Sequence, residues 1–328
     1  MTKLTALIIV FIALSSYTTP TSAHLRIRDP PTRRSPESSY YNQHKCISNN
    51  LASPVGFQGK FPYPCRGFAR GPALKTWTAG QQIKVEIDPN ANHHGGHCEL
   101  AISYDEKNFA VVYQAFDRCL ANCVTGNRAG CTITATLPAS LPASKNAILA
   151  WSWIAREGNR EYFHGCSDIE IKTTKKAKRA AKKGYTGKKM LVANYPGYPT
   201  IFEFNNTYNG AELYKRQPSI TIAPSKNEKA AKITASAGGC PLPAFDMGDV
   251  SKLPKKLPVP NTPCKGNEPA RCLHPEDPGL NGLLFIACDG TSWQQGSLSG
   301  GLKCVETEKG MMGYSLSAGD LKDDNNYN

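Results

Sequence analysis

One histidine of this chain can become a metal chelate through its position alone. Lys3 supplies a positive charge, residues 4–14 (LTALIIVFIAL) are apolar, and residues 21–23 (TSA) are small. This pattern is typical of a secretory signal peptide, so we expect cleavage between Ala23 and His24 and a secreted, extracellular protein. The freed α-amino group and imidazole of His24 can then hold one ion together. A further imidazole would give three nitrogens in one plane, which suits Cu(II).

The further imidazole must come from residues 92–98 (NHHGGHC), which contain His93, His94 and His97. Two glycines follow the first two histidines and permit a tight turn that leaves the rings exposed. Two alternatives stand beside this interpretation. The segment can be a polar turn whose histidines bind nothing, and signal peptidase can leave a histidine first by chance.

The cysteine content and the charge limit the class of protein. All twelve cysteines follow the signal segment, which predicts a disulfide framework in an exported chain. No C-x-x-C pair is followed by another, which argues against structural zinc. Much of the formal charge of +13 lies in residues 175–189 (KKAKRAAKKGYTGKK), predicted to be a solvated or disordered loop. The alternative for this tract is a patch for anionic glycan or membrane. We expect a monomer and no nucleic-acid partner.

The residues that could do chemistry need a scaffold, and the periodicity predicts strands. Alternating apolar and polar residues indicate strands with one buried face at 82–87, 99–104, 131–137 and 168–172. More continuously apolar runs at 109–116 and 147–155, with Trp151 and Trp153 as core residues, predict strands buried on both sides, and 219–223 predicts a last strand. These features predict an all-β protein, an immunoglobulin- or fibronectin-III-like β-sandwich with long loops. No amphipathic helix is predicted.

Composition divides the chain into segments. After the signal peptide (1–23), the sandwich is predicted to occupy residues 24–223, followed by a small, polar linker at 224–239. Residues 240–310 contain five cysteines and predict a small disulfide-rich module, with a disordered tail at 311–328. Because both the sandwich and the module hold an odd number of cysteines, one bridge can join them, with Cys240 as the expected donor.

Several motifs together resemble a known family. They are Pro196-Gly197-Tyr198-Pro199, residues 93–99 (HHGGHCE), Ser103-Tyr104-Asp105, Trp151-Ser152-Trp153, residues 158–163 (GNREYF) and Cys166. This set is similar to fungal lytic polysaccharide monooxygenases of auxiliary-activity family eleven, over roughly residues 24–223. The resemblance implies a copper-dependent enzyme with one ion per catalytic domain that oxidatively cleaves β-1,4 bonds of chitin. It also implies an external electron donor and dioxygen or hydrogen peroxide.

The resemblance also implies roles for single residues. The copper histidine of the family opens an H-x-G-G-x-C motif, which selects His93 beside His24, with His94 as the fallback ligand. Glu161 falls on a carboxylate beside the copper, and Phe163 on an axial aromatic that is usually tyrosine. The phenyl ring offers no oxygen to the axial position, although related bacterial chitin-active enzymes also carry phenylalanine there. The alternative for Glu161 is a surface salt bridge with Arg156 or Arg160.

Contacts with a polysaccharide are less defined by the sequence. Chitin is flat, so we expect the copper on a flat exposed face, with Tyr40 and Tyr41 as weak candidates for adhesion. Trp293, in the cysteine-rich module, is a candidate for stacking on sugar, and the alternative is burial in a small core. Asn205 opens a glycosylation sequon (NNT). The alternative function is a non-catalytic, secreted copper-binding or glycan-binding protein on the same fold.

Overall fold

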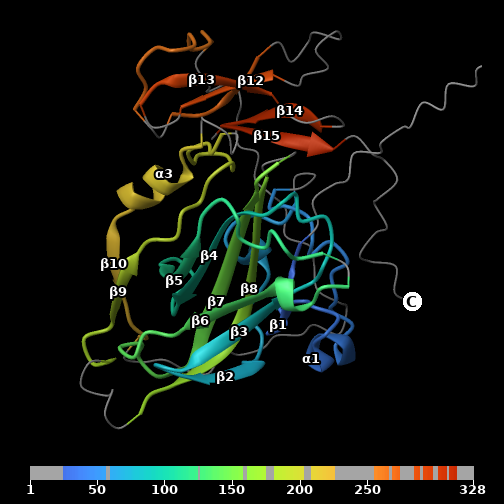
Figure 1. The fold of residues 1–328 in the computed structure, drawn as a ribbon, viewed down its shortest axis with the longest axis vertical. Helices are drawn as coiled ribbons and strands as arrows, with labels where there is room; N and C mark the ends of the chain where they lie inside the picture. The colour runs from blue at the N-terminus through green and yellow to red at the C-terminus, as the bar shows by residue number, and fades with distance from the viewer. Residues whose placement is uncertain are drawn as a thin grey trace, which may run out of the picture.

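The computed structural model describes residues 25–315, apart from 57–59, 125, 158–160, 175–180, 203–207, 226–254, 266–267, 274–283, 289–290, 298–301 and 309. Within this part of the chain, two β-sheets lie face to face and form a sandwich (Figure 1). No helix in the described ranges is long and apolar enough to cross a membrane. The prediction of an all-β protein is confirmed.

The larger sheet has five strands in the order β2-β8-β7-β4-β5. Their bounds are Lys75–Thr78 (β2), Tyr162–Lys172 (β8), Ser144–Ala155 (β7), Gly96–Ser103 (β4) and Ala110–Ala115 (β5). The pair β2 and β8 is parallel, and the other pairs are antiparallel. The smaller sheet has the order β1-β3-β6, with strands Ile27–Asp29, Gln82–Ile87 and Thr132–Thr136.

Side-chain alternation explains why the two sheets pack together. In β3, the buried residues Ile83, Val85 and Ile87 point to one side, as period two requires. They join a single apolar core with residues of the larger sheet, including Trp151 and Trp153. The prediction that both tryptophans are core residues is confirmed, and so is the sandwich. The immunoglobulin-like strand order within it stays a prediction.

Part of the basic tract differs from its prediction as a loop. Tyr185–Lys188 forms strand β9, which pairs with β10 (Ser219–Ile222) beside the sandwich. The ring of Tyr185 packs against the main core, and its hydroxyl donates to the carbonyl of Val111. This aromatic anchor holds the segment despite the lysines around it. Residues 175–180 of the tract lie outside the described residues.

The described residues include two short α-helices where the sequence analysis expected none. They are α1 (Ser39–Gln43) and α3 (Gly210–Arg216), and two 3-10 turns, η2 (Cys65–Gly67) and η3 (Ala129–Cys131), accompany them. Helix α3 buries Leu213 against residues of β7 and β8. A helix of seven residues spans two turns, so its apolar face is too short to produce a recognisable period.

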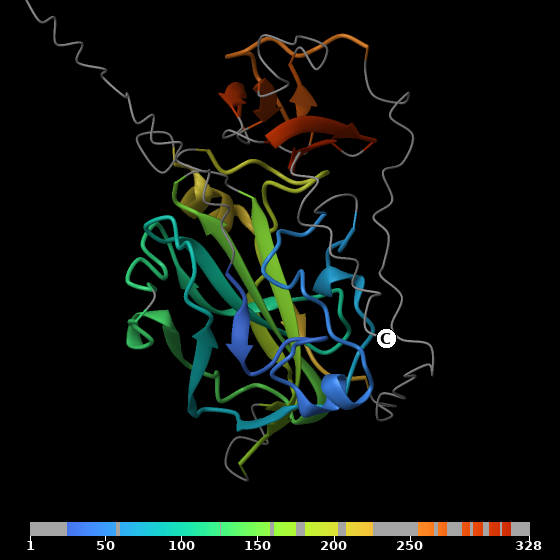
Figure 2. The same ribbon diagram turned by 90° about the vertical axis from the view of Figure 1, so that its right-hand side faces the viewer.

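The cysteine-rich segment forms two small sheets. One is β11 (Arg271–Cys272), β12 (Leu284–Cys288) and β13 (Trp293–Ser297), and the other is β14 (Leu302–Thr307) and β15 (Gly310–Ser315). Both lie at the end of the sandwich that carries α3 (Figures 1 and 2). Phe202 packs into their apolar cluster with Phe285 and Ala287. This contact attaches the module to the sandwich, while the linker predicted at 224–239 lies almost wholly outside the described residues.

Disulfide bonds staple both parts of the chain. Three lie in the sandwich, Cys65–Cys166, Cys98–Cys119 and Cys123–Cys131, and two in the module, Cys264–Cys288 and Cys272–Cys304. Cys46 is also disulfide-bonded. Cys240, the expected donor of a bridge between sandwich and module, lies outside the described residues.

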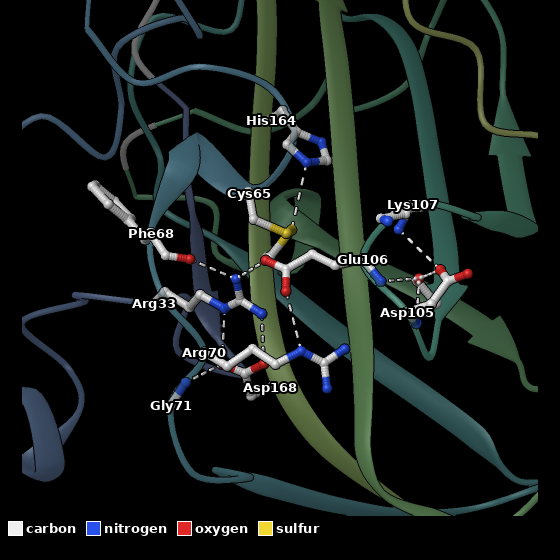
Figure 3. Close-up of a disulfide and its surroundings, with 12 residues drawn as sticks. Arg33, Cys65, Phe68, Arg70, Gly71, Asp105, Glu106, Lys107, His164 and Asp168 are labelled. Atoms are coloured by element: carbon white, nitrogen blue, oxygen red, sulfur yellow. Dashed lines mark hydrogen bonds and ion pairs between the residues drawn. A yellow bond between two sulfur atoms is a disulfide. The ribbon is translucent and has the colours of Figure 1, made fainter. Parts of the chain in front are cut away.

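A buried ion-pair network covers the outer face of the larger sheet. Arg33 donates from Nε and one Nη to the two carboxylate oxygens of Asp168 on β8, both at 2.9 Å, and also pairs with Glu106 (Figure 3). The backbone N–H of Gly71 donates to the same carboxylate at 2.8 Å. Burial works to lower the pKa of Arg33, but the charges of Asp168 and Glu106 outweigh it and raise that pKa.

Candidate functional site

At one end of the larger sheet, strands β4 and β8 begin and strand β7 ends. In the register, Gly96 at the start of β4 faces Ala155 at the end of β7, and Ile154 faces Tyr162 at the start of β8. The backbone N–H of Arg156 extends the first pairing by donating to the carbonyl of Gly95 at 2.8 Å. This register brings the loop before β4 and the residue before β8 to the same end of the sheet.

His93 stands in a sharp turn at this end. His93, His94 and Gly95 have φ angles of 45°, 58° and 103°, a left-handed run that is strained for residues other than glycine. At Gly96 the close approach matters, because a Cβ there would lie 2.0 Å from the carbonyl oxygen of Ile154. The glycines thus allow a tight turn, as the sequence indicated, and the turn packs against β7. The rings were expected to be exposed, but only that of His94 is, since Nε2 of His93 is buried.

The three histidines of the segment occupy different environments. The side chain of His94 is 77% exposed, and its Nδ1 lies 2.9 Å from a carboxylate oxygen of Glu157. His97 is buried and uses both ring nitrogens, with Nε2 2.8 Å from Glu99 and Nδ1 3.0 Å from the hydroxyl of Tyr208. His97 also lies on the outer face of the sheet, opposite the core residue Cys98. Its nitrogens are therefore committed to the fold.

An aromatic row connects His93 with β7 and β8. The ring of His93 lies 6.5 Å from that of Trp153, and Trp153 lies 5.1 Å from Phe163, its partner in the register. Phe163 is almost fully buried in the main core. Tyr162 packs in a different cluster on the outer face, which confirms that it points away from Phe163. Of these two neighbouring aromatic residues, only Phe163 faces the His93 side.

Glu161 directly precedes β8 and carries a buried carboxylate oxygen. Its Oε2 has no hydrogen-bond partner among the described residues. Burial raises the pKa of Glu161 to about 7, because the charged carboxylate loses hydration. The alternative partner Arg156 pairs with Asp117 and Glu157 instead. Arg160, the other alternative, lies outside the described residues.

His24 and Asn205 also lie outside the described residues. Leu25, which follows His24, is fully buried in the main core with Trp153 and Phe163. The carbonyl of Arg26 accepts from the backbone N–H of Asp88, at the start of the segment that leads to His93. The chain therefore enters the sandwich beside the loop before β4.

Within the described ranges, the other groups of metal-binding atoms do not form a competing site. Two clusters bring together histidine, cysteine or glutamate side chains, Cys65 with His164 and Cys166, and Cys264 with Glu268 and Cys288. Both cysteine pairs are disulfides, so no thiolate is available for a metal. Figure 3 shows the first disulfide beside His164. Burial, followed by the charges of two arginines, lowers the pKa of His164 to about 3, so its ring is neutral.

The structure favours the core alternative for Trp293. Its exposure is 7%, and it packs with Ile286 and Cys288 in the small core of the module. Sugar stacking needs an open ring face, which a buried indole does not offer. The stacking role of Trp293 stays a prediction, and its burial favours the alternative of a core residue. The sequence could not separate the two roles because a mini-core and a platform both favour tryptophan.

Comparison with known proteins points to one family. A stretch of 132 residues is 30% identical to AA11 family lytic polysaccharide monooxygenase A of Aspergillus fumigatus, covering 38% of this chain and 54% of that protein. A stretch of 251 residues is 28% identical to AA11 family lytic polysaccharide monooxygenase B of the same species, covering 71% and 56%. The chain thus spans about half the length of the curated relatives it matches.

Two further comparisons are less informative. A solved Jonesia denitrificans lytic polysaccharide monooxygenase is 16% identical and has a TM-score of 0.29, with 45% of this chain and 100% of that chain covered. No protein-family model matches the chain. The resemblance to fungal lytic polysaccharide monooxygenases of the AA11 family, first indicated by scattered motifs, is confirmed by the curated relatives.

Proposed function

We propose that this chain is a secreted, copper-dependent polysaccharide monooxygenase that oxidatively cleaves β-1,4 bonds in chitin. It would use an external electron donor together with dioxygen or hydrogen peroxide. The similarity to AA11 family enzymes supports the reaction class. The observation that carries the proposal is the buried Oε2 of Glu161, which has no hydrogen-bond partner among the described residues and lies at the strand end that also bears His93. A fold gains no stability from such a group, so a role in chemistry explains it better.

The donor set fits copper. After cleavage at Ala23, the α-amino group and imidazole of His24 would provide two nitrogens and His93 a third, a set that Cu(II) accepts in a tetragonal arrangement. Leu25 supports this assignment because its burial anchors the new terminus next to the loop that leads to His93. Copper, when bound, would supply the one-electron chemistry that activates the oxidant. His94 remains the fallback ligand.

The other residues of the site would prepare the surroundings of the ion. Phe163, which is buried beside Trp153, would exclude water from the surroundings of the ion and would offer it no oxygen ligand. Glu161, with its pKa raised to about 7 by burial, can hold a proton on its carboxyl group near neutral pH. It can therefore act as a general acid toward an oxygen atom placed beside it.

The remaining proposals concern the rest of the chain. We assign residues 1–23 to the signal peptide, 24–223 to the catalytic domain and 240–315 to the cysteine-rich module, and propose glycosylation of Asn205. The module extends beyond residue 310 because β15 pairs with β14 as far as Ser315, where the sequence predicted a disordered tail. We also propose a disulfide between Cys46 and Cys240. The five described bridges use ten of the twelve cysteines, and Cys46 is bonded as well. Non-reducing peptide mapping should recover this cross-linked pair, and a free thiol at Cys240 would contradict it.

The activity can be tested directly. Mature protein loaded with copper is incubated with powdered chitin and ascorbate, and soluble products are analysed by mass spectrometry. We expect oxidised oligosaccharides that disappear when copper is removed with a chelator. Binding to chitin without oxidised products would instead support a non-catalytic glycan-binding protein. Copper binding without either would support a copper-binding protein.

A further inference from the structure

Tyr198 is more exposed to solvent than the other tyrosines and phenylalanines that the structure describes. Tyr198 is 40% exposed, and it is the only phenylalanine, tyrosine or tryptophan classed as exposed among the side chains that the structure describes. It lies in the loop Pro196-Gly197-Tyr198-Pro199, between β9 and α3. A single exposed ring is common on protein surfaces, so the case for a role rests on how this loop holds the ring.

The loop that carries Tyr198 is built to hold a fixed shape. The N–H of Tyr198 donates to the carbonyl of Tyr195 at 3.0 Å, and the N–H of Asn194 donates to the carbonyl of Pro199 at 2.9 Å. The side-chain oxygen of Asn194 accepts from the N–H of Ile201 at 2.6 Å. Gly197 supplies the left-handed φ of 84° that the turn requires. The ring is therefore positioned before any ligand arrives.

Other tyrosines support the ring from behind. The ring of Tyr63 lies 6.0 Å from that of Tyr198 in an edge-on arrangement, and Tyr195 lies at 6.0 Å and is tilted. The hydroxyl of Tyr195 accepts from the N–H of Tyr63 at 3.1 Å, which ties the two supports together. Partial burial raises the pKa of Tyr198, so the phenol is neutral. The side chain thus has a supported inner side and an open outer side.

The position of Tyr198 relates it to the proposed catalytic end. Tyr63 also lies 6.0 Å from Tyr162, the residue that directly follows Glu161. Tyr195 and Tyr162 share one apolar cluster with Ile154, at the ends of β7 and β8. Tyr198 therefore contacts Tyr63, and Tyr63 contacts Tyr162, which lies at the strand end that bears Glu161.

We propose that Tyr198 is a substrate-binding residue that stacks on the apolar face of a pyranose ring in a β-1,4-linked polysaccharide. The proposal rests on the proposed function, because it assumes that such a chain crosses the end of the sandwich bearing Glu161. An open, neutral, rigid ring is the surface on which a sugar face packs. The weak candidates from the sequence do not share these features. Tyr41 is buried, and α1, which carries both Tyr40 and Tyr41, lies at the opposite end of the sandwich (Figure 1).

Binding to solid chitin tests the proposal without requiring turnover. Metal-free mature protein is mixed with increasing amounts of powdered chitin, and the unbound fraction is measured. We expect Tyr198→Ala to weaken binding about five- to tenfold, the loss of one aromatic contact, and Tyr198→Trp to restore it. Tyr40→Ala, a tyrosine change at the other end, is the matched control and should bind like the unaltered protein.

The outcomes separate this proposal from the proposed function. If the unaltered protein forms oxidised products but Tyr198→Ala binds chitin equally well, the stacking role is wrong and the function stands. If no products form but Tyr198→Ala weakens binding, the stacking role stands and the protein is a glycan binder. An equal loss for Tyr40→Ala would also overturn the proposal, because it would show a general effect of removing tyrosines.

Discussion

Two buried carboxyl groups, that of Asp168 on β8 and that of Glu161 just before it, differ in their hydrogen bonding. Asp168, near the end of the strand, accepts two hydrogen bonds from Arg33 and one from the backbone of Gly71. Glu161, just before the strand, buries Oε2 without a hydrogen-bond partner among the described residues. An unpaired buried polar group costs about 1–3 kcal/mol, whereas a paired one holds the fold together. Asp168 therefore stabilises the fold, whereas Glu161 is available to take part in a reaction.

His97 and His93 differ in a similar way, one serving the fold and the other lying at the proposed site. His97 commits Nδ1 to Tyr208 and Nε2 to Glu99, and it lies on the outer face of the larger sheet. His93 lies in the strained turn near Trp153, on the side that Phe163 and Leu25 share. Residues four positions apart in one short motif therefore have different roles, because the turn and the strand point them to different sides of the sheet.

The largest expected effect comes from blocking the terminus of the mature chain. One alanine added before His24 turns its α-amine into an amide, which is a poor donor and would have to lose a proton to coordinate. Copper affinity should fall by more than about 100-fold, the upper loss known for outer-shell changes, and chitin oxidation should cease. Titration calorimetry with Cu(II) and product analysis measure this, while the metal-free melting temperature should not change. Full activity of the extended protein would refute the role of His24.

A change at Glu161 tests the reactive side of the comparison. Glu161→Gln keeps the size of the side chain but removes the exchangeable proton, so the rate of product formation should fall by about 10²–10⁴-fold. Metal-free protein should remain folded. Asp117→Asn, which affects only the exposed partner of Arg156, is the control and should retain activity. Similar rates for Glu161→Gln and the unaltered protein would show that Glu161 does not move a proton.

A change at Asp168 tests the structural side. Asp168→Ala leaves Arg33 buried without its main partner and should lower the free energy of unfolding by about 3–5 kcal/mol. Denaturant unfolding of metal-free protein provides the measurement. Copper affinity at a temperature where the variant is folded should be unchanged. A large loss of copper affinity with no loss of stability would reverse the assignment of roles.

The smallest expected effect is on the pH dependence of the free energy of unfolding. Two buried groups, His164 and Glu161, change it in opposite directions. His164 has a pKa lowered to about 3, below its unfolded value, so the unfolded chain binds the extra proton between about pH 3 and 6.5. Stability should rise with pH in this window by up to about 1.4 kcal/mol per pH unit. His164→Phe keeps an aromatic ring against Tyr63 and Tyr162 and should remove this slope. An unchanged slope would mean that His164 is protonated in the fold.

For Glu161 the sign is reversed. Its pKa is raised to about 7, above the unfolded value, so the folded chain binds the extra proton. Stability of metal-free protein should therefore fall as pH rises from about 4.5 to 7, and Glu161→Gln should remove that fall. Unfolding measured across this range for both variants separates the two contributions. The same slope in Glu161→Gln and the unaltered protein would contradict burial of an unpaired carboxyl.

The amino-acid sequence alone determined the all-β class, most strand positions, the buried tryptophans and the family resemblance. Strand β3 matches the alternating segment at 82–87 residue for residue, because period two is a local property. The glycines after His94 also indicated a tight turn, since few other residues tolerate its φ angles. These features depend on neighbours in the chain, which the sequence displays.

Only the tertiary structure decided which side chains are covered and which are open. Trp293 is buried and Tyr198 is exposed, although the sequence analysis named the tryptophan, and not this tyrosine, as a candidate sugar platform. Asp168 gains Arg33 from a segment 135 residues away, while Glu161 gains no partner among the described residues. Burial and pairing depend on contacts between distant segments, and the free energy of a charge depends on those contacts. A local pattern carries no information about them, so the role of each carboxylate could be assigned only once the strands were assembled.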